Sequence, residues 1–491
     1  MKKVFVFIIL SIAIIFPARP LFADTPASDI QSMKSMMENM QKEMIKMQET
    51  IALQSLRIQQ LEAKKVLETP QPAASLQPLT TAAVPGDFKK GVAGAMGEVF
   101  PWLKGAKYGG DFRLRSEMFD YYDKNNDAGS TGTAADRSRN RFRIRLRWGF
   151  EKDYGDDWRV GFRLSTGSAT DQTSQMQTLG NRGYFTFKDI FIERAYATYA
   201  PSGLKQQGLL KEAKVGAGKF ENPFLRYSTP MVWDPDVAPE GVYETASFEL
   251  VSTENNKVSA QVTTGQFVIN EGTAPESDAA LFGYQGALTL STYVFNTKEP
   301  VELSVAASYY DYTNWFQTVT TNSSGVSFLR TNTLVADDFR VLDIYPELVF
   351  YIDRKPVTLW YDYAANLANV GTEDIAQSGG NDIHDMDEAW GAGLKFGKAK
   401  KKGDWEAFYA YYEIGANAVV AAFNDSDFGG PGQVGATNRV GHKFGLGVQL
   451  TDNIMANFTV SLVRPLNPSV LVASSTNEEV LRSQVDLNYK F

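Results

Sequence analysis

One short segment alternates arginine with large apolar residues, and this pattern limits the fold of the whole chain. Residues 141–150 read Arg-Phe-Arg-Ile-Arg-Leu-Arg-Trp-Gly-Phe. Successive side chains of a β-strand point to opposite faces, so the arginines share one face and the large apolar residues share the other. A buried sandwich core cannot take such a row of arginines, whereas a soluble sheet with one wet face can. A barrel with lipid outside and water inside requires this pattern.

Similar segments with a period of two recur along the rest of the chain and predict sixteen strands. The connections between them alternate between long and short, which is typical of an outer-membrane barrel with periplasmic turns and outer loops. A soluble sandwich has no reason to keep that rhythm. We therefore expect an all-β transmembrane barrel of about 16 antiparallel strands over residues 107–491. The predicted strands are residues 107–119, 140–151, 158–166, 188–199, 213–220, 243–252, 257–268, 281–295, 301–312, 340–352, 357–366, 388–397, 404–414, 439–450, 453–463 and 480–491.

Composition excludes several classes of function. The chain of 491 residues has no Cys and 2 His, which excludes disulfides, thiolate zinc sites, iron–sulfur clusters and CxxCH haem attachment. Its net charge of −8 argues against nucleic-acid binding. GxSxG, P-loop and HExxH motifs are absent from the sequence. We expect no enzyme activity, no cofactor and no metal. An acidic loop cluster around His384 could hold divalent ions against lipopolysaccharide, but a solvated loop is the favoured interpretation.

The N-terminus predicts export. Lys2 and Lys3 precede an apolar run over residues 4–16, and Leu-Phe-Ala at 21–23 resembles a cleavage site. Residues 1–23 are therefore expected to be a signal peptide. No later segment reaches 18 consecutive apolar residues, so we expect no transmembrane helix. Export without such a helix leaves a periplasmic protein, a secreted protein or an outer-membrane barrel.

A heptad pattern follows the signal and predicts a coiled coil over residues 24–68. A lone amphipathic helix on another surface is the alternative. A mixed Ile/Met seam does not single out dimers. Residues 69–87 read as a Pro-rich linker, and residues 88–106 as a short helical or connecting segment. The seam residues are Ile30, Met33, Met37, Met40, Met44, Met47, Ile51, Ile58 and Leu61.

Arginines of the first three strands form the first candidate site. If the apolar residues beside them face lipid, these arginines must line the lumen, because the reverse costs about 2–4 kcal/mol for each one near the bilayer midplane. The resulting basic wall would attract anions and predicts a modest anion preference, unless carboxylates elsewhere neutralise it. Its members are Arg113, Arg115, Arg141, Arg143, Arg145, Arg147, Arg159 and Arg163.

The third long connection is the second candidate site. Its Pro and aromatic content predicts an ordered loop. If this loop folds into the lumen, its carboxylates would face the arginines and set a field across the narrowest point; an ordinary outside loop is the alternative. These constriction-loop acids are Glu221, Asp234, Asp236 and Glu240.

The last strand alternates apolar residues up to a terminal aromatic residue. This pattern resembles the signal by which outer-membrane barrels are recognised for assembly, so the barrel-assembly machinery is an expected partner. The residues of this signal are Val485, Leu487, Tyr489 and Phe491.

The combination of signal, coiled coil, Pro-rich linker and sixteen-strand barrel resembles the putative porin family of Gram-negative outer membranes. The resemblance implies a passive, trimeric diffusion channel whose third loop lies opposite a basic wall. Which arginines reach the constriction does not carry over position by position. The most family-like segments are Gly-Asp-Phe-Arg-Leu-Arg at 110–115, Arg-Ala-Tyr at 194–196, Phe-Glu-Asn-Pro-Phe at 220–224, Trp-Asp-Pro-Asp at 233–236 and Pro-Glu-Gly at 239–241.

Three functions remain open at this point. The favoured one is a porin in the outer membrane, with the coiled coil in the periplasm. The second is a sheath for a partner such as a multihaem electron-transfer complex, and the third is an outer-membrane lipase. The expected partners are outer-membrane lipid and lipopolysaccharide, two further copies of the chain, and peptidoglycan or another periplasmic contact through the coiled coil.

Overall fold

A computed structural model describes residues 104–491 of the chain, with gaps at 124–136, 156, 170, 206, 226–228, 272–277, 295–298, 316–331, 333–338, 369–385, 430–436 and 468–477. The chain divides into two units, Met1–Lys89 and Lys90–Phe491, and all described residues belong to the second. The predicted signal peptide, coiled-coil seam and Pro-rich linker lie outside the described residues, as do most of the segment 88–106 and His384. Across the described ranges, no helix is long and apolar enough to cross a membrane.

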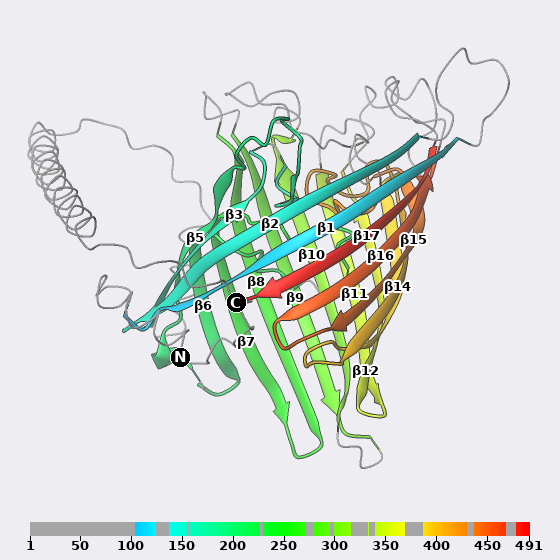
Figure 1. The fold of residues 1–491 in the computed structure, drawn as a ribbon. Helices are drawn as coiled ribbons and strands as arrows, with labels where there is room; N and C mark the ends of the chain where they lie inside the picture. Colours follow the sequence, from blue (N-terminus) through cyan, green and yellow to red (C-terminus); the bar gives the residue numbers. More distant parts are fainter. Residues whose placement is uncertain are drawn as a thin grey trace, which may run out of the picture. The chain divides into compact units, whose positions relative to one another are not determined.

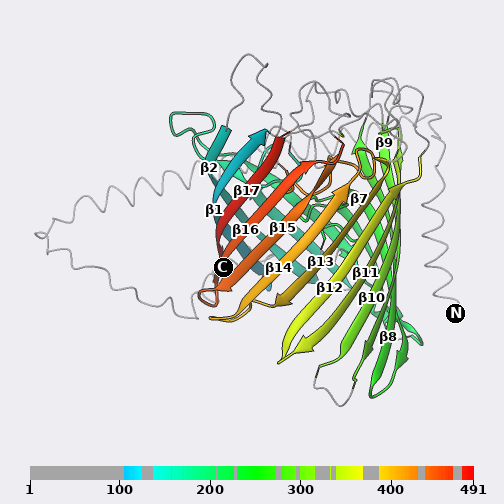
Figure 2. The same ribbon diagram turned by 90° about the vertical axis from the view of Figure 1, so that its right-hand side faces the viewer.

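The described residues form one antiparallel sheet that closes into a barrel. Each long strand pairs with the next along the chain, and β17 returns to pair with β1. Figure 1 shows β1 crossing the wall between β2 and β17, and Figure 2 shows β12 to β17 continuing side by side around it. The sixteen barrel strands are β1 (Lys107–Asp123), β2 (Arg137–Tyr154), β3 (Trp158–Thr166), β5 (Ile190–Tyr199), β6 (Leu210–Lys219), β7 (Glu240–Ser252), β8 (Asn256–Asn270), β9 (Ala279–Thr292), β10 (Val301–Thr313), β11 (Phe339–Ile352), β12 (Lys355–Asn366), β13 (Glu388–Gly397), β14 (Trp405–Ile414), β15 (Arg439–Gln449), β16 (Ile454–Pro465) and β17 (Glu478–Lys490).

All sixteen predicted strands are confirmed, and two shorter elements were not foreseen. The two-residue strand β4 (Gln177–Thr178) pairs with β2 beyond the end of β3. The 3-10 helix η2 (Ser202–Leu204) lies between β5 and β6. The predicted alternation of long and short connections holds except at one point: residues 271–278 and 293–300 are equally long, because β8 extends to Asn270 and β9 ends at Thr292.

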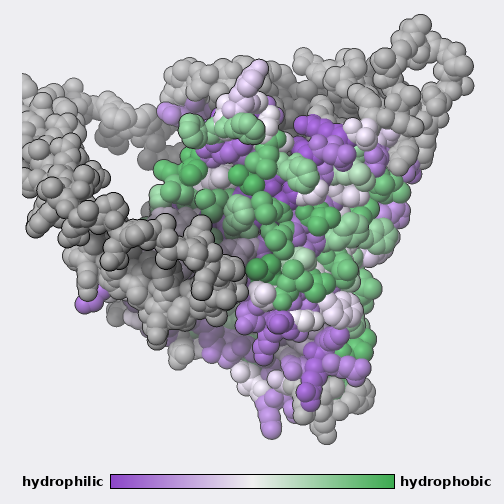
Figure 3. Space-filling model, in the orientation of Figure 1, coloured by the Kyte–Doolittle hydropathy of each residue, from purple (hydrophilic) through white to green (hydrophobic). Residues whose placement is uncertain are grey.

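The two faces of the wall follow the predicted pattern. Apolar side chains cover the outer face, and Figure 3 shows them gathered over the strands with polar residues at the lower rim. Phe142 is 64% exposed, whereas its neighbour Arg143 is 8% exposed. Among the residues of the predicted assembly signal, Val485, Leu487 and Tyr489 are exposed on the outer side of β17.

The buried apolar residues lie inside the barrel rather than between layers. The cluster joins inward side chains of β7 to β14 and β16 with residues of the connections between strands, most of which come from two long connections that fold into the lumen. These connections are the third loop, residues 220–239 between β6 and β7, and the seventh loop, residues 415–438 between β14 and β15. The interior is therefore filled by loops on one side and lined by charged strands on the other.

Candidate functional site

The register of β1 and β2 brings arginines directly opposite one another. Arg113 pairs with Arg145 across the two strands, and Arg115 pairs with Arg143. Like charges in opposite positions of a sheet destabilise it. These inward side chains therefore require carboxylates nearby, and the strands themselves supply several.

Asp111 is the first of these carboxylates. It lies on the inner face of β1 and accepts hydrogen bonds from the guanidinium groups of Arg145, at 2.8 Å, and Arg147, at 2.6 Å. Such charge-assisted bonds are about twice as strong as neutral ones. One strand-borne acid thus neutralises part of the charge of two predicted wall residues.

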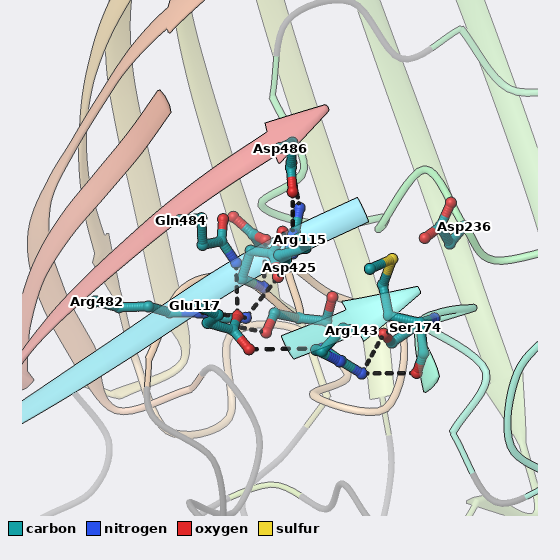
Figure 4. Close-up of polar contacts among 12 residues, drawn as sticks. Arg115, Glu117, Arg143, Ser174, Asp236, Asp425, Arg482, Gln484 and Asp486 are labelled. Atoms are coloured by element: carbon teal, nitrogen blue, oxygen red, sulfur yellow. Dashed lines mark hydrogen bonds and ion pairs between the residues drawn. The ribbon is translucent and has the colours of Figure 1, made fainter. Parts of the chain in front are cut away.

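Barrel closure supplies the second carboxylate. The pairing of β17 with β1 places Asp486 opposite Arg115, and the arginine donates from Nε at 2.7 Å and from Nη2 at 2.9 Å. Figure 4 shows this pair beside Gln484 and Arg482 of the same strand. The two parallel hydrogen bonds hold the guanidinium of Arg115 in one orientation, and the carboxylate offsets its positive charge.

Glu117 is the centre of a buried network between β1, β2 and β17. Its side chain is fully buried and pairs with Arg141 and with Arg482, whose Nη2 lies 2.5 Å from Oε1. Gln484 donates to the same oxygen at 2.8 Å, and Nη1 of Arg143 lies 3.9 Å from the other oxygen, Oε2. Because a buried charge is tolerated only when it is paired and hydrogen-bonded, Glu117 and Arg482 depend on each other.

The third loop is anchored inside the barrel by Phe224. The ring of Phe224 lies against Gly265 and Gly283 of neighbouring strands, and a Cβ on Gly283 would meet its Cζ at 2.3 Å. Met231 and Trp233 of the same loop are also buried in the apolar cluster. The loop is thus held in the lumen by packing, and the prediction of an ordered loop agrees with this arrangement.

Of the four predicted constriction acids, Asp236 approaches the arginines of β2. Its Oδ1 lies 3.6 Å from Nη1 of Arg145 and 3.8 Å from Nη1 of Arg147. Glu221 instead pairs with Arg194 of β5 at 2.6 Å. Glu240, the first residue of β7, pairs with Lys219 at 2.7 Å.

Asp234 joins the third loop to the seventh rather than to the arginines. Its backbone N–H donates to the carbonyl of Phe423 at 2.7 Å, and its Oδ2 accepts from the N–H of Ser426 at 2.9 Å. Burial raises the pKa of the Asp234 carboxyl well above its ordinary value, and the nearby Asp236 and Asp425 raise it further.

The seventh loop carries carboxylates that sequence analysis did not identify. Asp427 contacts Arg115 at 3.1 Å and Arg482 at 2.7 Å, and Asp425 contacts Lys443 of β15 at 2.6 Å. Burial alone would raise the pKa of Asp427, but Arg115, Arg482 and Lys443 hold that pKa well below its ordinary value. Two loops therefore bring acids to the inner wall.

The remaining predicted wall residues have varied surroundings. Arg113 donates to Asn488 at 2.5 Å, and Arg143 donates to the carbonyl of Met176 at 2.8 Å. Arg163 pairs with Glu193, which faces inward at an irregularity in the β3–β5 register. Arg159 lies near the turn end of the barrel, where its side chain is 48% exposed and pairs with Asp153.

A cavity of about 660 Å³ lies in the loop end of the barrel. It is bounded by the third loop at Trp233 and Asp236, by the connection after β3 at Gln172 and Gln175, and by Phe423 of the seventh loop. The cavity therefore adjoins the two loops that bring acids to the arginines.

Part of what sequence analysis missed was available in the sequence. Asp111, Arg113, Arg115 and Glu117 are alternate residues of one strand, so their side chains lie on the same face. If the arginines face inward, these two acids must face inward as well. Arg482 and Asp486 have the inward parity of β17 in the same way. Asp427 gave no such signal, because it lies in a loop without periodicity.

Comparisons with known proteins identify the family of the chain. The family model described as "Putative porin" matches residues 131–333 and 318–491, and no curated protein matches the chain. OprB of Pseudomonas putida aligns with 11% identity and a TM-score of 0.45, covering 83% of this chain and 97% of its own. Salmonella typhi OmpF, in a structure with daunomycin, aligns with 10% identity and a TM-score of 0.42, covering 79% and 97%. From the extent of the family match, the chain belongs to the putative porin family.

Proposed function

We propose that this protein is an outer-membrane porin through which small hydrophilic solutes diffuse passively, with a modest preference for anions. The observation that carries this proposal is a group of inward arginines on β1, β2 and β17, which we call the arginine sector. Inside the closed barrel, this sector faces acids of the third and seventh loops. The turns then face the periplasm, and the longer loops face outside.

The charge balance of the sector supports a modest preference. Within the described residues, its arginines outnumber the carboxylates that contact them. The carboxylates are Asp111, Glu117, Asp236, Asp427 and Asp486. The arginines are Arg113, Arg115, Arg141, Arg143, Arg145, Arg147 and Arg482. The surplus of positive charge is small, so the field on a permeating ion is weaker than an unpaired arginine wall would give.

The filled lumen favours a solute channel over a sheath. The third and seventh loops bury Trp233, Val419 and Phe428 among the inward side chains of the barrel. A haem-protein partner threaded through the barrel would have to displace this packing. Purification of the native protein without bound haem would agree with the channel, and a haem protein retained in constant proportion would support the sheath.

The proposed assembly is a homotrimer inserted in the outer membrane. The heptads of residues 30–61 support association in the periplasm, and the family resemblance favours threefold symmetry. The outward residues of β17 support recognition by the barrel-assembly machinery.

Planar-bilayer recording under a salt gradient tests the channel and its selectivity together. Charges are screened over about 10 Å at 0.1 M salt and about 3 Å at 1 M. The reversal potential should therefore indicate anion preference at low salt, and this preference should weaken as the salt concentration rises. Absence of channels from the native protein would overturn the proposed function. A cation preference at low salt would overturn the selectivity alone.

A further inference from the structure

The contact between Asp427 and the barrel wall differs from the other ion pairs of the sector. Asp111, Glu117 and Asp486 are fixed in strands, whereas Asp427 is brought to Arg115 and Arg482 by the seventh loop. Nη1 of Arg115 lies 3.2 Å from Oδ1 and 3.1 Å from Oδ2 of Asp427, and Nη2 of Arg482 lies 2.7 Å from Oδ1. A free carboxylate or phosphate could present oxygens to the same two guanidinium groups.

The two arginines are held in place without Asp427. Asp486 binds Nε and Nη2 of Arg115, and Glu117 binds Nε and Nη2 of Arg482. Both partners lie in strands of the closed barrel, so the arginines keep their positions when the loop moves. Without Asp427, Nη1 of Arg115 and Nη2 of Arg482 would still point to the space that its carboxylate fills.

The seventh loop is held by apolar packing of residues such as Val419 and Phe428 and by polar contacts that can be exchanged. Arg482 donates from Nη1 to the carbonyl of Ser426 at 2.9 Å, and Gln172 donates to the carbonyl of Ala422 at 2.7 Å. Asn332 holds the loop through the carbonyls of Ala416 and Val419. An anion competing for the arginines would remove the ion pairs of Asp427 and leave the ion pair of Asp425 with Lys443.

We propose that Arg115 and Arg482 form a binding site for small anions bearing a carboxylate or phosphate group, and that Asp427 of the seventh loop occupies this site as an internal substitute. Anion binding then displaces Asp427 and loosens the seventh loop from the inner wall. The biological use of this site rests on the proposed channel function. Anion binding to the site can be measured without measuring transport, so the two proposals are tested separately.

Calorimetric titration of the detergent-solubilised full chain with inorganic phosphate or acetate at low salt tests the site. Asp427→Asn should bind phosphate at least tenfold more tightly than the native protein, because the competing carboxylate is gone. Asp189→Asn is the matched control, since it removes the same charge from an acid paired with Arg182 in another loop. In the Asp427→Asn background, Arg115→Lys should reverse the gain, because lysine keeps the charge but lacks the forked geometry.

Three results would overturn the proposal: no gain in Asp427→Asn, the same gain in Asp189→Asn, or a gain that survives Arg115→Lys. Tighter binding of phosphate than of acetate would assign the site to phosphate-bearing solutes, and the reverse order would assign it to carboxylates. Binding without conductance in bilayers would retain the site and reject the channel. Conductance without this change in binding would do the opposite.

A measurement on the native chain keeps the proposal testable if the variants do not fold. Phe423 and Phe428 of the seventh loop are packed inside the barrel, so they should resist chymotrypsin while Asp427 is bound. Phosphate should speed cleavage at these residues several-fold relative to sodium chloride of equal ionic strength. Equal cleavage rates in the two salts would contradict displacement of the loop.

Discussion

At the scale of single residues, the inner arginines act as partners in ion pairs rather than as free charges. Sequence parity placed Arg143 and Arg145 inside the barrel, and their low exposure agrees with that placement. Parity could not predict their surroundings, because contacts such as Arg145 with Asp236 depend on a loop folding back. If these arginines faced only water, glutamate could replace both of them. In the structure they lie beside Asp111 and Glu117, and glutamates there would add like charges. Neutral glutamine is therefore the better substitution for testing how their charge affects selectivity.

Asp236→Asn tests the contact between the third loop and the arginine sector. The change removes the carboxylate near Arg145 and Arg147 while keeping the shape of the side chain. Anion preference at low salt should increase, with a reversal potential shifted further toward the anion value and barrel stability unchanged. Glu240→Gln is the control, because Glu240 pairs with Lys219 instead. An unshifted reversal potential in Asp236→Asn would place the permeation path away from this contact.

At the scale of elements, the third loop is positioned by shape. Gly283→Ala adds a methyl group where the ring of Phe224 now lies, and overpacking of this kind typically costs about 1–3 kcal/mol. Because the strand cannot yield easily, the loop should be displaced and single-channel conductance should change. Gly286→Ala on the same strand is the control, since no atom lies within 4 Å of its added Cβ. If both variants conduct like the native protein, Phe224 does not set the pore.

The contact between the third and seventh loops should depend on pH through Asp234. Its raised pKa, caused first by burial and then by Asp236 and Asp425, means that the docked state favours the protonated acid. The contact between the two loops is therefore strongest at acid pH. It weakens as the pH rises from about 3.9, the ordinary pKa of Asp, through the raised pKa of Asp234.

Conductance should fall on acidification, because the two loops are then held together inside the barrel, and Asp234→Asn should flatten this response. Asp427 opposes it only in stronger acid, because its lowered pKa keeps it charged. An equal acid response in Asp234→Asn would assign the effect to another group.

At the scale of the whole molecule, the sequence was sufficient for the barrel and insufficient for its interior. Period-two alternation marks each strand locally, so strands such as β3 and β13 were predicted at the bounds they have. Filling of the lumen arises from aromatic loop residues that pack against distant strands, such as Phe224 on β8 and β9. No local periodicity encodes such contacts, and the seventh loop was therefore missed although the third was anticipated.

The last prediction concerns assembly of the whole chain. Every barrel strand has two hydrogen-bonded neighbours, and β1 closes on β17, so the barrel does not need residues 24–68 for its wall. Deleting those residues should loosen the proposed trimer, seen as a smaller particle by light scattering, while heat-modifiable mobility on gels persists. Met40→Lys tests the same association with one substitution, because Met40 is a d position of the predicted heptads and buried lysine there opposes packing. Asn39→Lys carries the same new charge at a position outside the predicted seam and should leave the proposed trimer intact. Loss of heat-modifiable mobility in the deletion would show that the segment supports the barrel itself, and an unchanged particle in both the deletion and Met40→Lys would assign association to the barrel wall.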